Sequence, residues 1–323
     1  MHTDLPLEQL RSYRPTVAEP EDFDAFWAAT LDQSRSAGGP PRAEPADTPL
    51  TTLAVDDVTF PGFGGDPVRA WWLRPPGAQR LPCVVEFVGY GGGRGLAHDR
   101  LAWASAGFGH LVMDTRGQGS TWGGGDTPDP HGAGPSYPGV LTRGVEAPQD
   151  YYYRRLVTDA VRAVDYVLTR PEVDPERVAV AGTSQGGGLA LAAGALHEQV
   201  AAVIADVPFL CHIERAMSIT DSFPYQELVA YLAVHRGAEE RVLRTVSYVD
   251  GVNMARRITV PTQVSVALMD PTCPPSTVFA AANHLPSPPT VEVYPYNRHE
   301  GGGSCQWERS VRWLGGVWSG DAR

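Results

Sequence analysis

Short apolar runs alternate with amphipathic stretches along most of this chain. The first two runs, residues 52–60 and 68–74, flank a Pro- and Gly-rich turn and predict a β-hairpin. The run at 82–88 is mainly apolar, which is typical of a strand buried on both faces of a sheet. Further short runs predict strands at 109–114, 177–181, 200–206, 262–267 and 291–294.

Helical periodicity is strongest at residues 152–169, where apolar side chains form a single stripe. Helices are also expected at 21–33, 98–106 and 187–196, whereas residues 36–49, rich in Pro, Gly and Ala, are interpreted as a loop. An opening helix and a hairpin, followed by alternating strands and helices, indicate an α/β fold with a mostly parallel, doubly wound sheet.

One segment, residues 208–258, interrupts the alternation. It holds helical pieces at 226–235 and 239–246, and we expect this helical insertion to form a cap over the strand ends. The 323 residues are otherwise expected to form one domain, 1–323, because single α/β domains reach this length. Sheets of this kind bind ligands at the carboxyl ends of their strands.

Composition narrows the possible partners and the compartment. A formal net charge of -11 argues against nucleic acid and disfavours anionic membranes. No run of about 18 apolar residues predicts a membrane span, and the N-terminus lacks a secretory signal pattern, so we expect a cytoplasmic protein. The four cysteines are dispersed without zinc spacing, so we expect reduced thiols and no metal or other cofactor.

A candidate nucleophile lies in the pentapeptide Gly182-Thr-Ser-Gln-Gly186, which follows a predicted strand and opens a predicted helix. In a G-x-S-x-G turn the serine sits on a sharp, strained bend, and side chains at the glycine positions would crowd it. The main-chain N–H of Gln185 would then face the oxyanion of an acyl transfer. A Gly-rich turn formed by chance is the alternative, and the strand-to-helix context favours Ser184 as nucleophile.

The acid and base of a catalytic triad are expected further along the chain, in the order Ser, Asp, His. Asp270 follows the next-to-last predicted strand, and His299 follows the last strand beside a cluster of glycines. A serine hydroxyl needs an imidazole to take its proton, and the imidazole needs a carboxylate to orient it. Asp206 and Asp250 are alternative acids, but Asp206 ends a strand one position too early in the usual order.

A second oxyanion donor is expected in the Gly-rich loop after the strand at 82–88, where the main-chain N–H of Tyr90 is the candidate. Tyr90 is also expected to line a small acyl pocket with Pro208 and Phe209. The loop is not a Walker motif, because no Gly-Lys-Ser/Thr follows, and a dinucleotide fingerprint lacks a clear downstream acid. Arg116, after the next strand, is interpreted as structural support for neighbouring loops.

From about residue 13 to residue 313 the sequence resembles the acetyl xylan esterase and cephalosporin-C deacetylase family of carbohydrate esterases. The resemblance is carried by Arg116-Gly-Gln-Gly119, Asp150-Tyr-Tyr-Tyr-Arg154, Gly182-Thr-Ser-Gln-Gly-Gly187, Asp206-Val-Pro-Phe-Leu-Cys-His212, Ser247-Tyr-Val-Asp250, Met269-Asp-Pro-Thr-Cys-Pro-Pro-Ser276 and Tyr294-Pro-Tyr-Asn-Arg-His-Glu-Gly-Gly302. It implies an α/β-hydrolase fold and removal of O-acetyl groups from small acetylated sugars, such as xylo-oligosaccharides, and from cephalosporin C. The family motifs match Ser184, Asp270 and His299, with the amides of Gln185 and Tyr90 as oxyanion donors.

The same resemblance implies an intracellular homo-oligomer, a hexamer with its active sites facing an inner chamber, in which residues 140–153 match an interface element. The family often has His-Gly-Tyr where this chain has Val88-Gly-Tyr90. Two alternatives remain: a carboxylesterase or peptidase of the same fold acting on another small substrate, and a non-catalytic binding protein on a hydrolase scaffold. The charged insertion disfavours a lipase lid, and the complete triad disfavours a binding protein.

Overall fold

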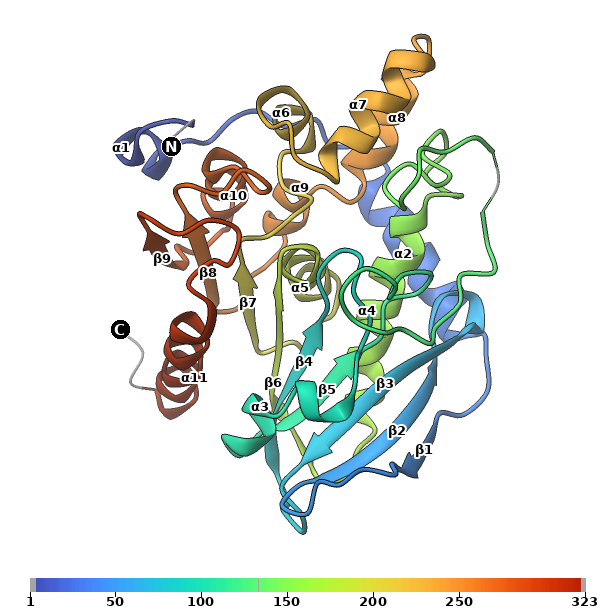
Figure 1. The fold of residues 1–323 in the computed structure, drawn as a ribbon, viewed down its shortest axis with the longest axis vertical. Helices are drawn as coiled ribbons and strands as arrows, with labels where there is room; N and C mark the ends of the chain where they lie inside the picture. Colours follow the sequence, from blue (N-terminus) through green and yellow to red (C-terminus); the bar gives the residue numbers. More distant parts are fainter. Residues whose placement is uncertain (1–3, 133, 321–323) are drawn as a thin grey trace.

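The computed structural model describes residues 4–132 and 134–320 (Figure 1). Within these residues, nine strands form one sheet in the order β1-β2-β3-β5-β4-β6-β7-β8-β9. The pairs β1–β2, β2–β3 and β3–β5 are antiparallel, and every later pair along the sheet is parallel. This arrangement confirms the predicted hairpin and the mostly parallel sheet.

The strands lie close to the predicted runs. Their bounds are β1 Arg42–Pro45, β2 Ala54–Pro61, β3 Pro67–Arg74, β4 Leu81–Phe87, β5 Gly109–Met113, β6 Val173–Thr183, β7 Ala202–Asp206, β8 Thr262–Ala267 and β9 Thr290–Tyr294. The interpretation of residues 36–49 as a loop is wrong at β1. This strand lies at the edge of the sheet with all four residues exposed, so it lacks the apolar alternation that reveals a half-buried strand.

The helices differ more from the prediction. They are α1 Leu7–Arg11, α2 Phe23–Arg35, α3 Ala102–Ser105, α4 Tyr152–Leu168, α5 Gln185–Leu196, α6 Ile213–Ile219, α7 Tyr225–Val234, α8 Glu239–Ser247, α9 Gly251–Ala255, α10 Pro275–Ala282 and α11 Gly303–Ser319. The single helix predicted at 98–106 is wrong: the chain forms a short 3₁₀ turn, Ala97–Asp99, and leaves helical geometry at Arg100 before α3. The long helix α11 was not predicted.

Helices cover both faces of the sheet, which explains the apolar character of its parallel strands. Along β4, Cys83, Val85 and Phe87 belong to a large core shared with α4 and α5. The intervening Val84 joins a smaller core with Trp103, from α3, and residues of α11. Alternate residues of this strand therefore face two different hydrophobic layers.

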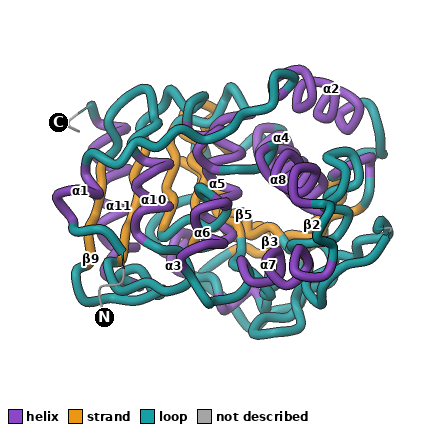
Figure 2. Tube along the Cα trace, turned by 90° about the horizontal axis from the view of Figure 1, so that it is seen from above, coloured by secondary structure: helices purple, strands orange, loops and turns teal. Residues whose placement is uncertain are grey.

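A helical cap is inserted in the chain between β7 and β8, which are neighbours in the sheet. It contains α6, α7, α8 and α9, in agreement with the insertion predicted at 208–258. In Figure 1, α6, α7 and α8 stand beyond the upper ends of the central strands, and Figure 2 looks down on this side of the molecule. These are the carboxyl ends of the parallel strands, where sheets of this class carry their ligand sites.

Among residues 4–132 and 134–320, no helix combines the length and the apolar character required to cross a lipid bilayer.

Candidate active site

Ser184 lies on a sharp turn between β6 and α5. Its backbone has φ 59° and ψ −119°, a conformation that costs energy in a residue with a side chain. The flanking glycines make the turn possible. A Cβ at Gly182 would lie 2.3 Å from the carbonyl carbon of Gly186, and one at Gly186 would lie 2.1 Å from the carbonyl oxygen of Phe87. The motif therefore forms the predicted strand-turn-helix elbow.

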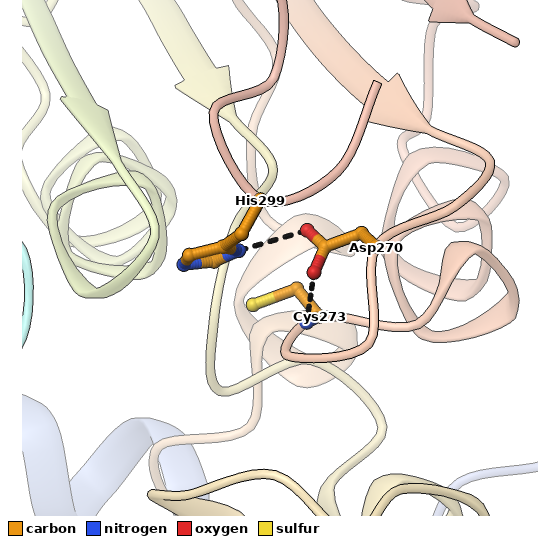
Figure 3. Close-up of side chains that lie close together, drawn as sticks. All are labelled: Asp270, Cys273 and His299. Carbon is orange, nitrogen blue, oxygen red and sulfur yellow. Dashed lines mark hydrogen bonds and ion pairs between the residues drawn. The ribbon is translucent and has the colours of Figure 1, made fainter. Parts of the chain in front are cut away.

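Three residues distant in sequence meet at this turn. The Oγ of Ser184 lies 2.9 Å from Nε2 of His299, and Nδ1 of His299 lies 2.8 Å from Oδ2 of Asp270. The other carboxylate oxygen of Asp270 accepts the main-chain N–H groups of Thr272 and Cys273. Figure 3 shows one oxygen of the carboxylate facing His299 and the other facing Cys273. A carboxylate only accepts, so Nδ1 carries the imidazole proton and Nε2 can accept the serine proton.

The alternative acids lie outside this relay. Asp250 caps α9, and its two oxygens accept main-chain N–H groups from Val252, His212 and Ile213. Asp206 contributes its carbonyl oxygen, which accepts the N–H of Ser184, whereas its Oδ1 is buried without a hydrogen-bond partner in the described part of the chain. The structure thus brings Ser184, Asp270 and His299 together and gives both rivals other roles.

The carboxyl of Asp206, with one oxygen buried, makes stability depend on pH. Burial raises its pKa from 3.8 to about 7, so ionising it in the folded protein is unfavourable. The shift stabilises the folded protein while this carboxyl is protonated. That stabilisation is complete below about pH 3.9 and is lost as the pH rises toward 7. We expect Asp206→Asn to stabilise the protein relative to wild type at pH 8 by up to about 4 kcal/mol, and much less at pH 4. Denaturant unfolding at both pH values checks this, and an equal difference at the two values contradicts it.

Two glutamines connect the loops around the nucleophile. The side-chain oxygen of Gln185 accepts hydrogen bonds from Tyr153 and Gln118, and its amide nitrogen donates to the carbonyl of Val88. Gln118 in turn accepts the N–H of Gly91 at 2.6 Å. The start of α5 is therefore tied to the loops after β4 and β5. Gln118 belongs to the Arg116-Gly-Gln-Gly119 segment that sequence reasoning took as structural support.

The second predicted oxyanion residue, Tyr90, makes three hydrogen bonds that fix its position. Its hydroxyl donates to Oε1 of Glu227 at 2.5 Å and accepts the N–H of Val140 at 2.7 Å. Its carbonyl accepts the indole N–H of Trp122 at 2.8 Å. No acceptor within residues 4–132 and 134–320 takes the main-chain N–H of Tyr90 or of Gln185, the first residue of α5. Both amides thus remain available to a ligand.

Glu227, on cap helix α7, is a site residue that sequence reasoning missed. Its Oε2 accepts the N–H of Leu141 while Oε1 accepts the Tyr90 hydroxyl, and burial raises the pKa of its carboxyl. The cap is thereby joined to the oxyanion loop through one carboxylate. The sequence carried no signal for this contact, because the partners are 137 residues apart and match no motif.

We expect Glu227→Gln to lower kcat for an acetyl ester about tenfold with little change in KM, because its amide N–H₂ cannot accept the N–H of Leu141 and the oxyanion loop loosens. Steady-state kinetics check this. Glu146→Gln is the matched control, since Glu146 also accepts a tyrosine hydroxyl, that of Tyr231, away from this loop. A Glu227→Gln enzyme with the kinetics of the control contradicts a positioning role.

A cavity of about 470 Å³ opens onto the relay. Its lining consists of Glu86, Phe87, Val88, Gly89, Tyr90, Arg100, Trp122, Thr183, Ser184, Phe223, Pro224, Thr272 and His299. The expectation that Pro208 and Phe209 form its wall is wrong. Phe209 is fully buried, with its ring packed 4.5 Å from that of Tyr225, because the turn after β7 packs its main chain closely against α5.

One group of three side chains in the described residues has potential metal ligands. The candidate ligand atoms of Asp270, Cys273 and His299 lie within 4.8 Å of one another. Asp270 and His299 already use theirs in the relay, and burial raises the pKa of the Cys273 thiol well above its usual value. A metal ion bound here would have to displace the proton between Asp270 and His299 and the proton of the Cys273 thiol. These three residues are therefore better suited to proton transfer than to metal binding.

Comparisons with known proteins point to one family. The family model described as acetyl xylan esterase (AXE1) matches residues 1–317. The acetyl xylan esterase from Paenibacillus sp. R4 is 39% identical, with a TM-score of 0.91 over 96% of this chain and 99% of that chain. Acetyl xylan esterase 1 from Thermoanaerobacterium sp. JW/SL YS485 is 33% identical, with a TM-score of 0.90 over 98% and 99% of the two chains.

Among curated proteins, the acetyl esterase Axe7A of Xylanibacter ruminicola is 29% identical over 300 residues, which is 88% of this chain. The chain spans only 65% of that relative's length. The acylaminoacyl peptidase of Pyrococcus horikoshii has a TM-score of 0.60 at 13% identity and covers 81% of this chain and 40% of its own, so it shows the fold alone. Together these structures confirm the predicted α/β-hydrolase fold.

Proposed function

The chain belongs to the acetyl xylan esterase family, whose members are carboxylic ester hydrolases, and from this membership we propose that it removes O-acetyl groups from small acetylated saccharides. The observation that carries the proposal is the continuous hydrogen-bonded relay of Asp270, His299 and Ser184, in which His299 and Ser184 line a cavity. A serine activated in this way, beside two free main-chain amides, is suited to acyl transfer.

In the proposed reaction, Ser184 Oγ attacks the acetyl carbonyl carbon while His299 Nε2 takes its proton. The N–H groups of Gln185 and Tyr90 stabilise the oxyanion, and each such donor contributes about 3 kcal/mol in the transition state. The bond to the sugar oxygen then breaks, and His299 gives its proton to that oxygen. Water, deprotonated by His299, attacks the acetyl group on Ser184, and acetate leaves as the serine regains its proton.

The substrate range of the proposal includes xylo-oligosaccharides and cephalosporin C. The similar proteins include an acetyl esterase and two acetyl xylan esterases, which supports an acetyl group on a xylan-derived alcohol. Beside Ser184, the floor of the cavity is closed by Phe87 and Val88, each only 1% exposed, which favours a short acyl group.

A panel of esters tests this function. We expect hydrolysis of acetylated xylo-oligosaccharides, cephalosporin C and p-nitrophenyl acetate, with kcat/KM falling about tenfold per added methylene, because each costs about 1–3 kcal/mol. A long-chain ester and an aminoacyl amide should be poor substrates. Turnover that is fastest on the amide would support a peptidase instead, and absence of both burst and turnover on p-nitrophenyl acetate would support a binding protein.

We further propose that the protein acts in the cytoplasm as a homo-oligomer, a hexamer by analogy with its family. Residues 140–153 match the interface element of the family. Within this segment the side chains of Val140, Leu141 and Tyr151 are buried in the chain itself, so an interface there would use the exposed residues of the segment. Light scattering of the purified protein checks the assembly, and a monomer at micromolar concentration would contradict it.

A further inference from the structure

Two exposed aromatic side chains stand out at the catalytic cavity. Trp122 is 58% exposed and Phe223 is 55% exposed, and both line the cavity that holds Ser184 and His299. Large apolar side chains left in water are informative, because folding normally buries them. Neither ring was singled out by the sequence, and the relay does not use them.

The indole of Trp122 contacts the oxyanion loop through a hydrogen bond and through ring packing. Its N–H donates to the carbonyl of Tyr90, so its orientation is fixed relative to the oxyanion loop. Its ring carbons also pack against that loop: a Cβ at Gly92 would lie 2.3 Å from the ring, and one at Gly89 would lie 3.5 Å from it. Phe223 is stacked on Tyr137, with ring centroids 5.9 Å apart and planes inclined by 24°. The cavity therefore has two aromatic surfaces, one packed on the oxyanion loop and the other stacked on Tyr137.

The exposed fractions of the lining residues distinguish the floor of the cavity from its opening. Its floor is formed by Ser184, 9% exposed, with Phe87 and Val88 almost inaccessible, whereas Trp122 and Phe223 are open to solvent. The ester carbonyl has to reach Ser184, so the acetyl group occupies the floor. The alcohol part of the ester must then extend outward, past the two aromatic rings.

Polar groups line the same cavity. Arg100 donates from Nη1 to Oε1 of Glu86 at 2.8 Å, and both residues belong to the lining. A guanidinium has five N–H donors, so Arg100 has further donors to offer. Apolar rings together with planar charged side chains suit an alcohol that has carbon-bound hydrogens on its faces and hydroxyl groups around its edge. A pyranose ring has this chemistry.

We propose that Trp122 and Phe223 form a leaving-group subsite, in which the acetyl-bearing pyranose packs on the indole of Trp122, with Phe223 as a second apolar wall and Arg100 as a hydroxyl-binding group. The inference rests on the proposed function, and it explains how the same active site would select the alcohol part of its ester substrate. Because the indole also holds the carbonyl of Tyr90, Trp122 has a second role in positioning the oxyanion loop.

The test compares acetylated xylobiose with ethyl acetate, which has the same acyl group and no ring. The readout is the ratio of kcat/KM for the two esters, measured with wild type, Trp122→Leu, Trp122→Phe and Phe223→Leu. We expect the ratio to fall at least tenfold in Trp122→Leu and severalfold in Phe223→Leu. Trp122→Phe should keep most of the ratio, since it retains a ring, but should lower kcat for both esters because it loses the hydrogen bond to Tyr90.

Tyr296→Leu is the control, since Tyr296 is an 83% exposed aromatic outside the cavity lining and its loss should leave the ratio at the wild-type value. A wild-type ratio in Trp122→Leu, or in Phe223→Leu if the first variant fails to fold, overturns the subsite and leaves the proposed function standing. A wild-type enzyme that hydrolyses ethyl acetate but no acetylated saccharide overturns the proposed function, and the subsite with it.

Discussion

Replacing Ser184 by alanine is expected to lower kcat for acetyl esters by about 10⁴-fold or more, because the hydroxyl is the atom that receives the acetyl group. The residue is only 9% exposed and its main-chain hydrogen bonds do not involve the hydroxyl, so the fold should persist. Initial rates with p-nitrophenyl acetate measure the loss. Thermal unfolding of the variant is the control for folding, and a folded variant with wild-type turnover would refute this role.

Asp270→Asn is expected to reduce kcat about 10⁴-fold. The carboxylate accepts the proton on His299 Nδ1, whereas an asparagine can turn its N–H₂ toward the ring and stabilise the tautomer that cannot take the serine proton. The two main-chain N–H groups from Thr272 and Cys273 should still hold the side chain in place. The loss should therefore appear in kcat and leave the folded structure intact.

Asp206→Asn is the matched control for this prediction, because Asp206 also ends a central strand and was the rival acid. Its side chain makes no hydrogen bond to His299, so we expect kcat within a few-fold of wild type. Comparable losses in Asp206→Asn and Asp270→Asn, measured on the same ester at the same pH, would contradict the assignment of the acid.

The sheet and the relay could be predicted because their signals are local. Each buried strand appears as an apolar run, and the two glycines around Ser184 reflect a turn in which a Cβ would collide with main-chain atoms. Asp270 and His299 were found from their positions after the last two strands, since parallel strands bring such residues to one edge of a sheet. The predicted triad residues accordingly meet within hydrogen-bonding distance.

The features that sequence reasoning missed depend on long-range packing. Glu227 reaches Tyr90 from the cap, and Trp122 packs on the oxyanion loop from the loop after β5, and neither residue belongs to a recognisable motif. Phe209 was predicted in the acyl pocket, but its ring is buried in the core beside Tyr225. Position along a strand predicts the edge at which a residue lies, whereas the direction of its side chain depends on neighbours that the sequence does not reveal.

Covalent labelling shows directly whether Ser184 is the nucleophile that His299 activates. The protein is treated with an organophosphate ester, which phosphorylates activated serines, and peptide mass spectrometry then locates the adduct. We expect one phosphoryl group per chain, on Ser184, formed in step with the loss of activity and absent from His299→Ala. Complete inactivation with the adduct on another residue, or full activity retained after Ser184 is labelled, would rule out Ser184 as the nucleophile.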